Sequence, residues 1–149
     1  MDHIKFVSVK SFLEDYLVVD ILINGYRLID LLQTIERPFA QAEGRISLAG
    51  AYEGLPPLLV LPPKKHYWGN AEKAYLSPDG RVILLEYAYS GVPGDWTFAA
   101  KIEVTGEFVR WSEFGNVQRP EWDYSGIGPF TFDIRQYRDG LEEAKKRSY

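Results

Sequence analysis

The sequence predicts an α+β fold in which antiparallel strands predominate. Apolar residues alternate with polar ones, or cluster in β-branched runs, in both halves of the chain, and turn residues separate these runs. Helical spacing is confined to two segments. We therefore expect an N-terminal hairpin, a C-terminal meander, a short helix near 30–37 and a C-terminal helix. A length of 149 residues suits a single domain spanning residues 1–149.

The N-terminal part of the chain predicts the hairpin. Residues Ile4–Lys10 mostly alternate, which is typical of a strand with one solvated face. Tyr16–Ile23 is rich in β-branched residues and ends at Asn24-Gly25, a pair that tolerates the positive φ angles of a type I′ turn. A returning strand is expected to begin at Tyr26.

The middle of the chain is interrupted by glycines and prolines. We expect Asp30 to cap a short helix over 31–37 that ends before Pro38, because a proline disfavours the helical conformation of the residue before it. Between later glycines and prolines, Arg45–Ala49 and Leu58–Leu61 are short apolar runs, which we interpret as candidate strands.

Three consecutive strands are expected in the C-terminal half. The turn Ser77-Pro-Asp-Gly80 leads into a run that is apolar at both alternating positions and should be covered on both faces. The predicted strands are Arg81–Tyr89, Trp96–Val104, Glu107–Phe114 and, as a fourth, Pro129–Phe132, with a loop at 90–95. Asp133 and Gln136 have the spacing of a capping box, which predicts a helix through about Lys146.

Composition and missing motifs argue against several classes of protein. The absence of cysteine excludes thiol nucleophiles and thiolate metal sites. A net charge of −4 with scattered basic residues argues against nucleic acid as a partner. Phosphate-loop, dinucleotide and nucleophile-elbow motifs are missing, and two histidines are too few for a zinc site. We expect no catalytic residue, metal or cofactor, no membrane partner, and a cytoplasmic location.

Two groups of residues are candidate binding sites. Trp122, Asp123 and Tyr124 lie in a loop before Pro129, where the aromatic rings either close the core or form a surface for a partner. The second group is Lys65, His66 and Trp68, which combine positive charge with a stacking face. The other interpretation of this second group is a surface loop that covers the edge of the core.

Part of the chain resembles a set of small uncharacterised bacterial cytosolic proteins. The resemblance rests on Val109-x-Trp111-x-x-Phe114, on Trp122-Asp-Tyr-Ser-Gly-Ile-Gly-Pro-Phe-x-Phe-Asp133 with Gln136-Tyr137, and on Val19–Gly25 with Leu28 and Leu31-Leu32. It implies a fold unit and no particular activity. Some small acidic bacterial proteins of this general kind neutralise toxins, which suggests a comparable role by analogy.

These observations leave more than one function open. The first is a non-enzymatic protein-interaction module, of an immunity or regulatory type, that binds another protein. The alternative is a small-molecule-binding protein or a hydrolase with an aromatic pocket lined by Lys65, His66, Trp68, Trp122 and Tyr124. A third reading makes the aromatic segment structural and places the function in other residues.

Overall fold

The computed structural model describes residues 1–89 and 95–148, so the loop expected at 90–95 lies almost entirely outside the described residues. The strands are β1 (Ile4–Lys10), β2 (Leu17–Ile23), β3 (Tyr26–Arg27), β4 (Tyr52–Gly54), β5 (Val82–Tyr87), β6 (Phe98–Thr105), β7 (Phe108–Asn116) and β8 (Phe130–Asp133). The helices are α1 (Leu28–Ala42), the short α2 (Pro57–Val60) and α3 (Ile134–Ser148), with 3₁₀ turns η1 (Ile46–Leu48), η2 (His66–Trp68) and η3 (Lys73–Tyr75). The expected α+β class is confirmed.

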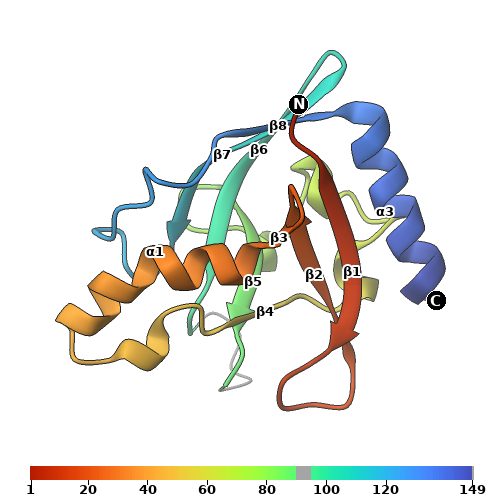
Figure 1. Ribbon diagram of the computed structural model, residues 1–149. Helices are drawn as coiled ribbons and strands as arrows, with labels where there is room; N and C mark the ends of the chain where they lie inside the picture. The colour runs from red at the N-terminus through yellow and green to blue at the C-terminus, as the bar shows by residue number, and fades with distance from the viewer. Residues whose placement is uncertain (90–94, 149) are drawn as a thin grey trace.

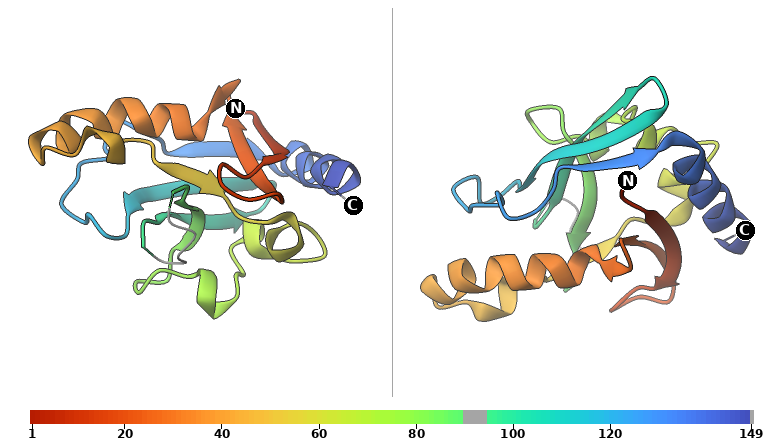
Figure 2. Two further views of the ribbon diagram at one scale, coloured as in Figure 1. Left: turned by 90° about the horizontal axis from the view of Figure 1, so that it is seen from below. Right: turned by 45° about the horizontal axis from the view of Figure 1, so that its top comes forward.

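The strands form two antiparallel sheets that share one core. One sheet has the order β1-β2-β3 and the other the order β4-β5-β6-β7-β8, so the predicted hairpin and the predicted meander are both present. The sheets are joined where Val19 N–H donates to Leu55 O at 2.8 Å and where Asp2 N–H donates to Thr131 O at 3.0 Å. Helices α1 and α3 lie on opposite sides of the strands (Figures 1 and 2).

The last helix is packed onto the first strand by large aromatic side chains. The Phe6 ring of β1 lies 5.7 Å from the Tyr137 ring of α3 and 4.8 Å from the Tyr67 ring. Trp111 Nε1 donates to the Tyr137 hydroxyl at 3.1 Å, and that hydroxyl donates to the Tyr67 carbonyl. Phe132 is also fully buried, and Phe130 is partly buried against the same cluster, so the 130–137 segment closes the core where α3 begins.

The Asn24-Gly25 turn and the Asp133 cap have the expected geometry, but the predicted capping box does not form. Asn24 and Gly25 have φ angles of 54° and 86°, as a type I′ turn requires. The Asp133 carboxylate accepts from the N–H groups of Arg135 and Gln136, so it caps α3. The Gln136 side chain does not complete a capping box, because it exchanges hydrogen bonds with the backbone N–H and C=O of Ile4 on β1.

The helix expected over 31–37 is longer at both ends. Helix α1 begins directly after β3 with Arg27 as its N-cap, so Asp30 lies in the first turn and is not the cap. Pro38 lies inside the helix and does not end it. Tertiary packing explains why the helix continues past the proline. The Phe39 ring stacks on the Trp122 ring, and the Ala40 side chain is buried in the core.

Two predicted strands are wrong. Arg45–Ala49 contains the 3₁₀ turn η1, and Leu58–Leu61 falls on the helical turn α2. Pro57 occupies the first helical position of α2, where its fixed φ and missing N–H favour a helix start. Short apolar runs of this length do not distinguish a strand from a buried helical turn.

Candidate functional site

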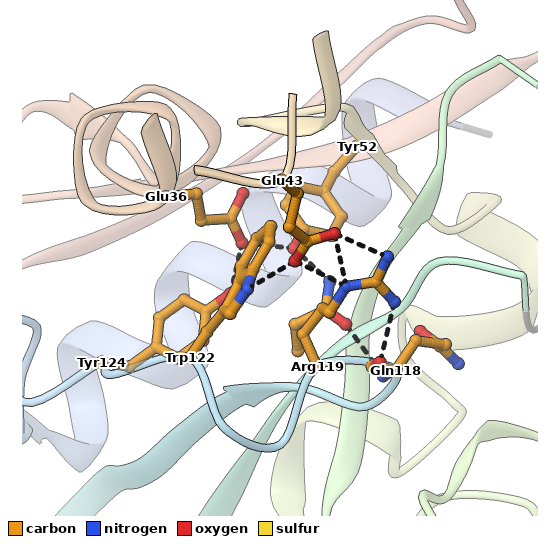
Figure 3. A network of polar contacts seen from close by, with 8 residues as sticks. Glu36, Glu43, Tyr52, Gln118, Arg119, Trp122 and Tyr124 are labelled. Atoms are coloured by element: carbon orange, nitrogen blue, oxygen red, sulfur yellow. Dashed lines mark hydrogen bonds and ion pairs between the residues drawn. The ribbon is translucent and has the colours of Figure 1, made fainter. Parts of the chain in front are cut away.

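A buried glutamate connects α1 to two distant segments (Figure 3). Glu36 is fully buried, and its Oε1 accepts from Gly50 N–H at 2.9 Å. Its Oε2 accepts from the hydroxyls of Tyr52 and Tyr124, each at 2.5 Å. Asn116 Nδ2 donates to the Tyr52 hydroxyl at 2.7 Å, which brings β7 into the same network. The carboxylate therefore ties α1 to β4 and to the loop before β8.

Burial controls the protonation of this network. It raises the pKa of Glu36, although the hydroxyls of Tyr124 and Tyr52 and the Gly50 N–H oppose the shift by hydrogen bonding to the carboxylate. Burial also raises the pKa of both tyrosines well above the usual value, so they remain hydroxyl donors. Because three donors already satisfy the carboxylate and hold it inside the fold, the geometry indicates an anchor rather than a general base.

A second carboxylate continues the network towards the surface. Glu43 follows the last residue of α1, seven positions after Glu36, and accepts three hydrogen bonds from the Arg119 guanidinium, at 3.0, 3.1 and 3.2 Å. Trp122 Nε1 donates to the same carboxylate at 3.0 Å. The Arg119 hydrogen bonds hold the pKa of Glu43 below its usual range. The guanidinium also lies over the Trp96 ring, 5.1 Å from its centroid.

The aromatic residues predicted from the loop before β8 are buried. Trp122 and Tyr124 each expose 7% of their surface, and their polar atoms bind Glu43 and Glu36. Asp123 and Ser125 are exposed, and Asp123 Oδ1 accepts from the Ser125 N–H at 2.8 Å. Of the two interpretations of this loop, the geometry gives the rings a place in the core and leaves the Asp123 side chain on the surface.

The second predicted group lies on another part of the molecule. Lys65 and Trp68 line a hollow of about 640 Å³ beside α3, whereas Trp122 lines a hollow of about 340 Å³ together with Arg119. Tyr124 lines a third hollow with Phe114 and others, of about 310 Å³. The residues proposed for one pocket are therefore distributed over several surfaces.

His66 is held inside the fold. It exposes 2% of its surface, and its Nε2 lies 2.8 Å from the Ile83 carbonyl oxygen, to which it donates in the tautomer that carries the proton on Nε2. Burial lowers the pKa of His66 from 6.5 to about 4, with the Ile83 hydrogen bond and Glu72 acting in the opposite direction. The imidazole is therefore neutral at pH 7.

We expect His66 to destabilise the fold in acid. The unfolded state binds the proton below about pH 6.5 and the folded state only near pH 4, so the stability from this group is complete above 6.5 and is lost as the pH falls to 4. The loss amounts to about 3 kcal/mol. Urea unfolding at pH 7 and pH 4 measures it, with His66→Gln as the matched variant that retains a donor. Equal pH dependence of the two proteins would refute this assignment.

A surface that the sequence interpretation missed lies on the β1–β2 loop and on Tyr89, which follows β5. Phe12, Leu13, Tyr16 and Tyr89 expose 65%, 53%, 40% and 50% of their surfaces, and we call these four residues the Phe12 surface. The Phe12 and Tyr89 rings are in contact, with centroids 4.8 Å apart. Phe12 and Tyr89 also line a hollow of about 280 Å³. One sequence feature indicates this surface: the apolar pair Phe12-Leu13 lies in a turn segment, where polar residues are usual.

Comparison with known proteins finds no match to this chain among protein-family models, curated proteins or solved structures. Among residues 1–89 and 95–148, no helix combines the length and apolar character needed to cross a bilayer. Within the same ranges, no three side chains of His, Asp or Glu are grouped so that they could hold a metal ion.

Proposed function

We propose that the protein is a non-enzymatic interaction module, of an immunity or regulatory type, that binds another protein through the Phe12 surface. The observation that supports this proposal most directly is the exposure of Phe12 and Leu13 next to Tyr89, on a loop that the fold holds in place. Exposed apolar clusters commonly mark interaction sites, and aromatic residues are prominent among those that dominate binding energy.

The Phe12 surface is preorganised by a carboxylate of β4. Both Glu53 oxygens lie 2.9 Å from the Ser11 hydroxyl, and Glu53 Oε2 accepts from the Phe12 N–H at 2.8 Å. The Ser11 N–H also donates to the Tyr16 carbonyl at 2.9 Å, which closes the loop. A loop that is already ordered loses less conformational entropy when it binds, so these bonds favour affinity.

Charge favours a basic partner. The loop carries Glu14 and Asp15 beside the apolar residues, and both are exposed. Asp15 is paired only at the surface, with Lys10 at 3.3 Å. Together with the net charge of −4, this arrangement attracts a positively charged surface and accelerates encounter with it. We place the interaction in the cytoplasm, a location that fits a chain without cysteine.

Substitution of Phe12 tests the proposal. A photo-crosslinking amino acid at position 12 is expected to give a defined adduct with one partner in native cells, whereas the same group at Leu58, an exposed apolar residue of α2, gives none. Purified partner should then bind Phe12→Asp at least about tenfold more weakly than wild type, and Leu58→Asp without change. Both positions are exposed, so the fold is retained. Equal adducts at the two positions, or equal affinities, would contradict the proposal.

Binding of a small molecule is a second candidate function, and one observation favours it. The hollow of about 640 Å³ brings Lys65 and Trp68 together with residues of α3. His66 does not line this hollow, and it supplies no exposed imidazole for hydrolysis.

A further inference from the structure

A basic hollow lies between the 62–68 segment and α3. We call it the basic hollow and define it by the charged and aromatic residues of its wall, Lys64, Lys65, Trp68, Arg138, Glu142 and Lys145. Four of these side chains are cationic and one is anionic, although the whole chain has a net charge of −4. Positive charge concentrated against the net charge of a protein is a feature of anion-binding sites.

Most of this positive charge is not neutralised within the fold. Lys64 pairs with Glu72 at 2.9 Å. Over residues 1–89 and 95–148, Lys65, Arg138 and Lys145 form no ion pair. These three cations are therefore free to bind an anion without first breaking an internal pair.

One wall of the basic hollow is a single face of α3. Its residues recur at helical spacing, Ile134, Arg138, Glu142 and Lys145, while the neighbouring face of the helix is buried through Tyr137, Leu141 and Ala144. Because the buried face fixes the helix against the core, the backbone positions of Arg138, which is exposed, and of Lys145, which is half-buried, are fixed as well.

The facing wall is aromatic and is also held by the core. Trp68 ends the turn η2, whose preceding residues His66 and Tyr67 are buried. The Trp68 ring lies 5.0 Å from the Tyr137 ring, and the Arg138 guanidinium lies 5.8 Å from the Trp68 ring centroid. The basic hollow thus combines a planar apolar surface with a guanidinium next to it.

We propose that the basic hollow binds a phosphorylated organic molecule of nucleotide size. Its volume of about 640 Å³ lies within the range of small-molecule sites. Lys65, Arg138 and Lys145 match the charge and the hydrogen-bond acceptors of phosphate groups. Trp68 offers a face to a planar ring, and the Glu142 carboxylate accepts hydrogen bonds from sugar hydroxyls. This inference is independent of the Phe12 surface.

Calorimetry with ATP as the probe tests the inference at low and at physiological ionic strength. Wild type is expected to bind ATP in a 1:1 complex that weakens as salt is added. Arg138→Ala and Lys145→Ala should each weaken binding about tenfold. Lys146→Ala is the matched control: it removes a neighbouring cation of the same helix that does not line the basic hollow, and it should leave the affinity unchanged. Circular dichroism confirms that each variant is folded.

Two further probes separate the ligand classes. Trp68→Leu should weaken the binding of ATP but not the binding of inorganic tripolyphosphate, because only ATP carries a planar ring that can stack on Trp68. Absence of ATP binding, or equal losses in Lys145→Ala and Lys146→Ala, would overturn the site. Tripolyphosphate binding as tightly as ATP would overturn the organic ligand, and a tighter complex with a hexaglutamate peptide would assign the basic hollow to an acidic segment of a protein instead.

Discussion

Gly54→Ala is expected to destabilise the protein by about 3 kcal/mol or more, or to prevent folding. A Cβ atom at position 54 would lie 1.7 Å from the Val19 carbonyl oxygen and 2.5 Å from its carbon. These are backbone atoms of β2, so they cannot move away by rotating a side chain. The adjacent hydrogen bond from Val19 N–H to Leu55 O joins the two sheets, and the substitution forces them apart at this joint.

Gly126→Ala provides the control for this steric effect. A Cβ atom at position 126 meets no atom within 4 Å, and the residue does not have a positive φ angle. Its expected change in the free energy of unfolding is below about 1 kcal/mol. Urea unfolding of both variants, followed by near-ultraviolet circular dichroism, measures the difference. A Gly54→Ala protein as stable as Gly126→Ala would show that the sheets do not approach so closely.

Glu36→Ala should reduce the free energy of unfolding by at least about 3 kcal/mol at pH 7, because it leaves two buried tyrosine hydroxyls and the Gly50 N–H without their acceptor. Glu36→Gln should reduce the free energy of unfolding by less, since the amide oxygen can still accept a hydrogen bond from the Gly50 N–H. Its NH₂ group, however, faces hydroxyls that need an acceptor, and the Tyr52 hydroxyl already accepts from Asn116. Urea unfolding should therefore rank the proteins as wild type, then Gln, then Ala.

The pH dependence distinguishes the charged network from simple packing. Because burial raises the pKa of Glu36, the folded state keeps this proton at pH values where the unfolded state has lost it. The stability from this group is complete below its ordinary pKa of 4.5 and declines as the pH rises through the raised value. Glu36→Gln should lack this decline, while Glu121→Gln, an exposed control, should retain it. Identical pH profiles for wild type and Glu36→Gln would contradict the titration.

Elements with local signals could be predicted from the sequence. The Asn24-Gly25 turn and the Asp133 cap depend on the conformations that these residues and their neighbours adopt, so the hairpin and the start of α3 follow directly. The length of α1 does not follow, because contacts made by Phe39 with the distant Trp122 outweigh the local effect of Pro38. Gly54 looks like an interruption in the sequence, yet it lies in a strand where only the absence of a Cβ allows close packing.

In the candidate site, too, local signals could be predicted and long-range contacts could not. The sequence directed attention to Trp122 and Tyr124, but their burial depends on carboxylates 79 and 88 residues away. Glu36 and Glu43 lie seven residues apart, a spacing that places two side chains on one helix face only if the helix continues past Pro38. A helix expected to end at residue 37 therefore gave no reason to place Glu36 and Glu43 on the same helix face. The binding roles of all six residues stay predictions: Trp122, Asp123, Tyr124, Lys65, His66 and Trp68.

The contact between α3 and β1 also bears on how the chain folds during synthesis. Ile4 and Gln136 are joined by two hydrogen bonds, and Phe6 packs on Tyr137, so α3 supplies part of the cover of the first strand. During synthesis, Phe6 lacks this contact until α3 has left the ribosome. Contacts that span so much of the chain also slow folding through the entropy of closing a long loop. A chaperone that binds exposed aromatic segments can therefore bind Phe6 before α3 is in place.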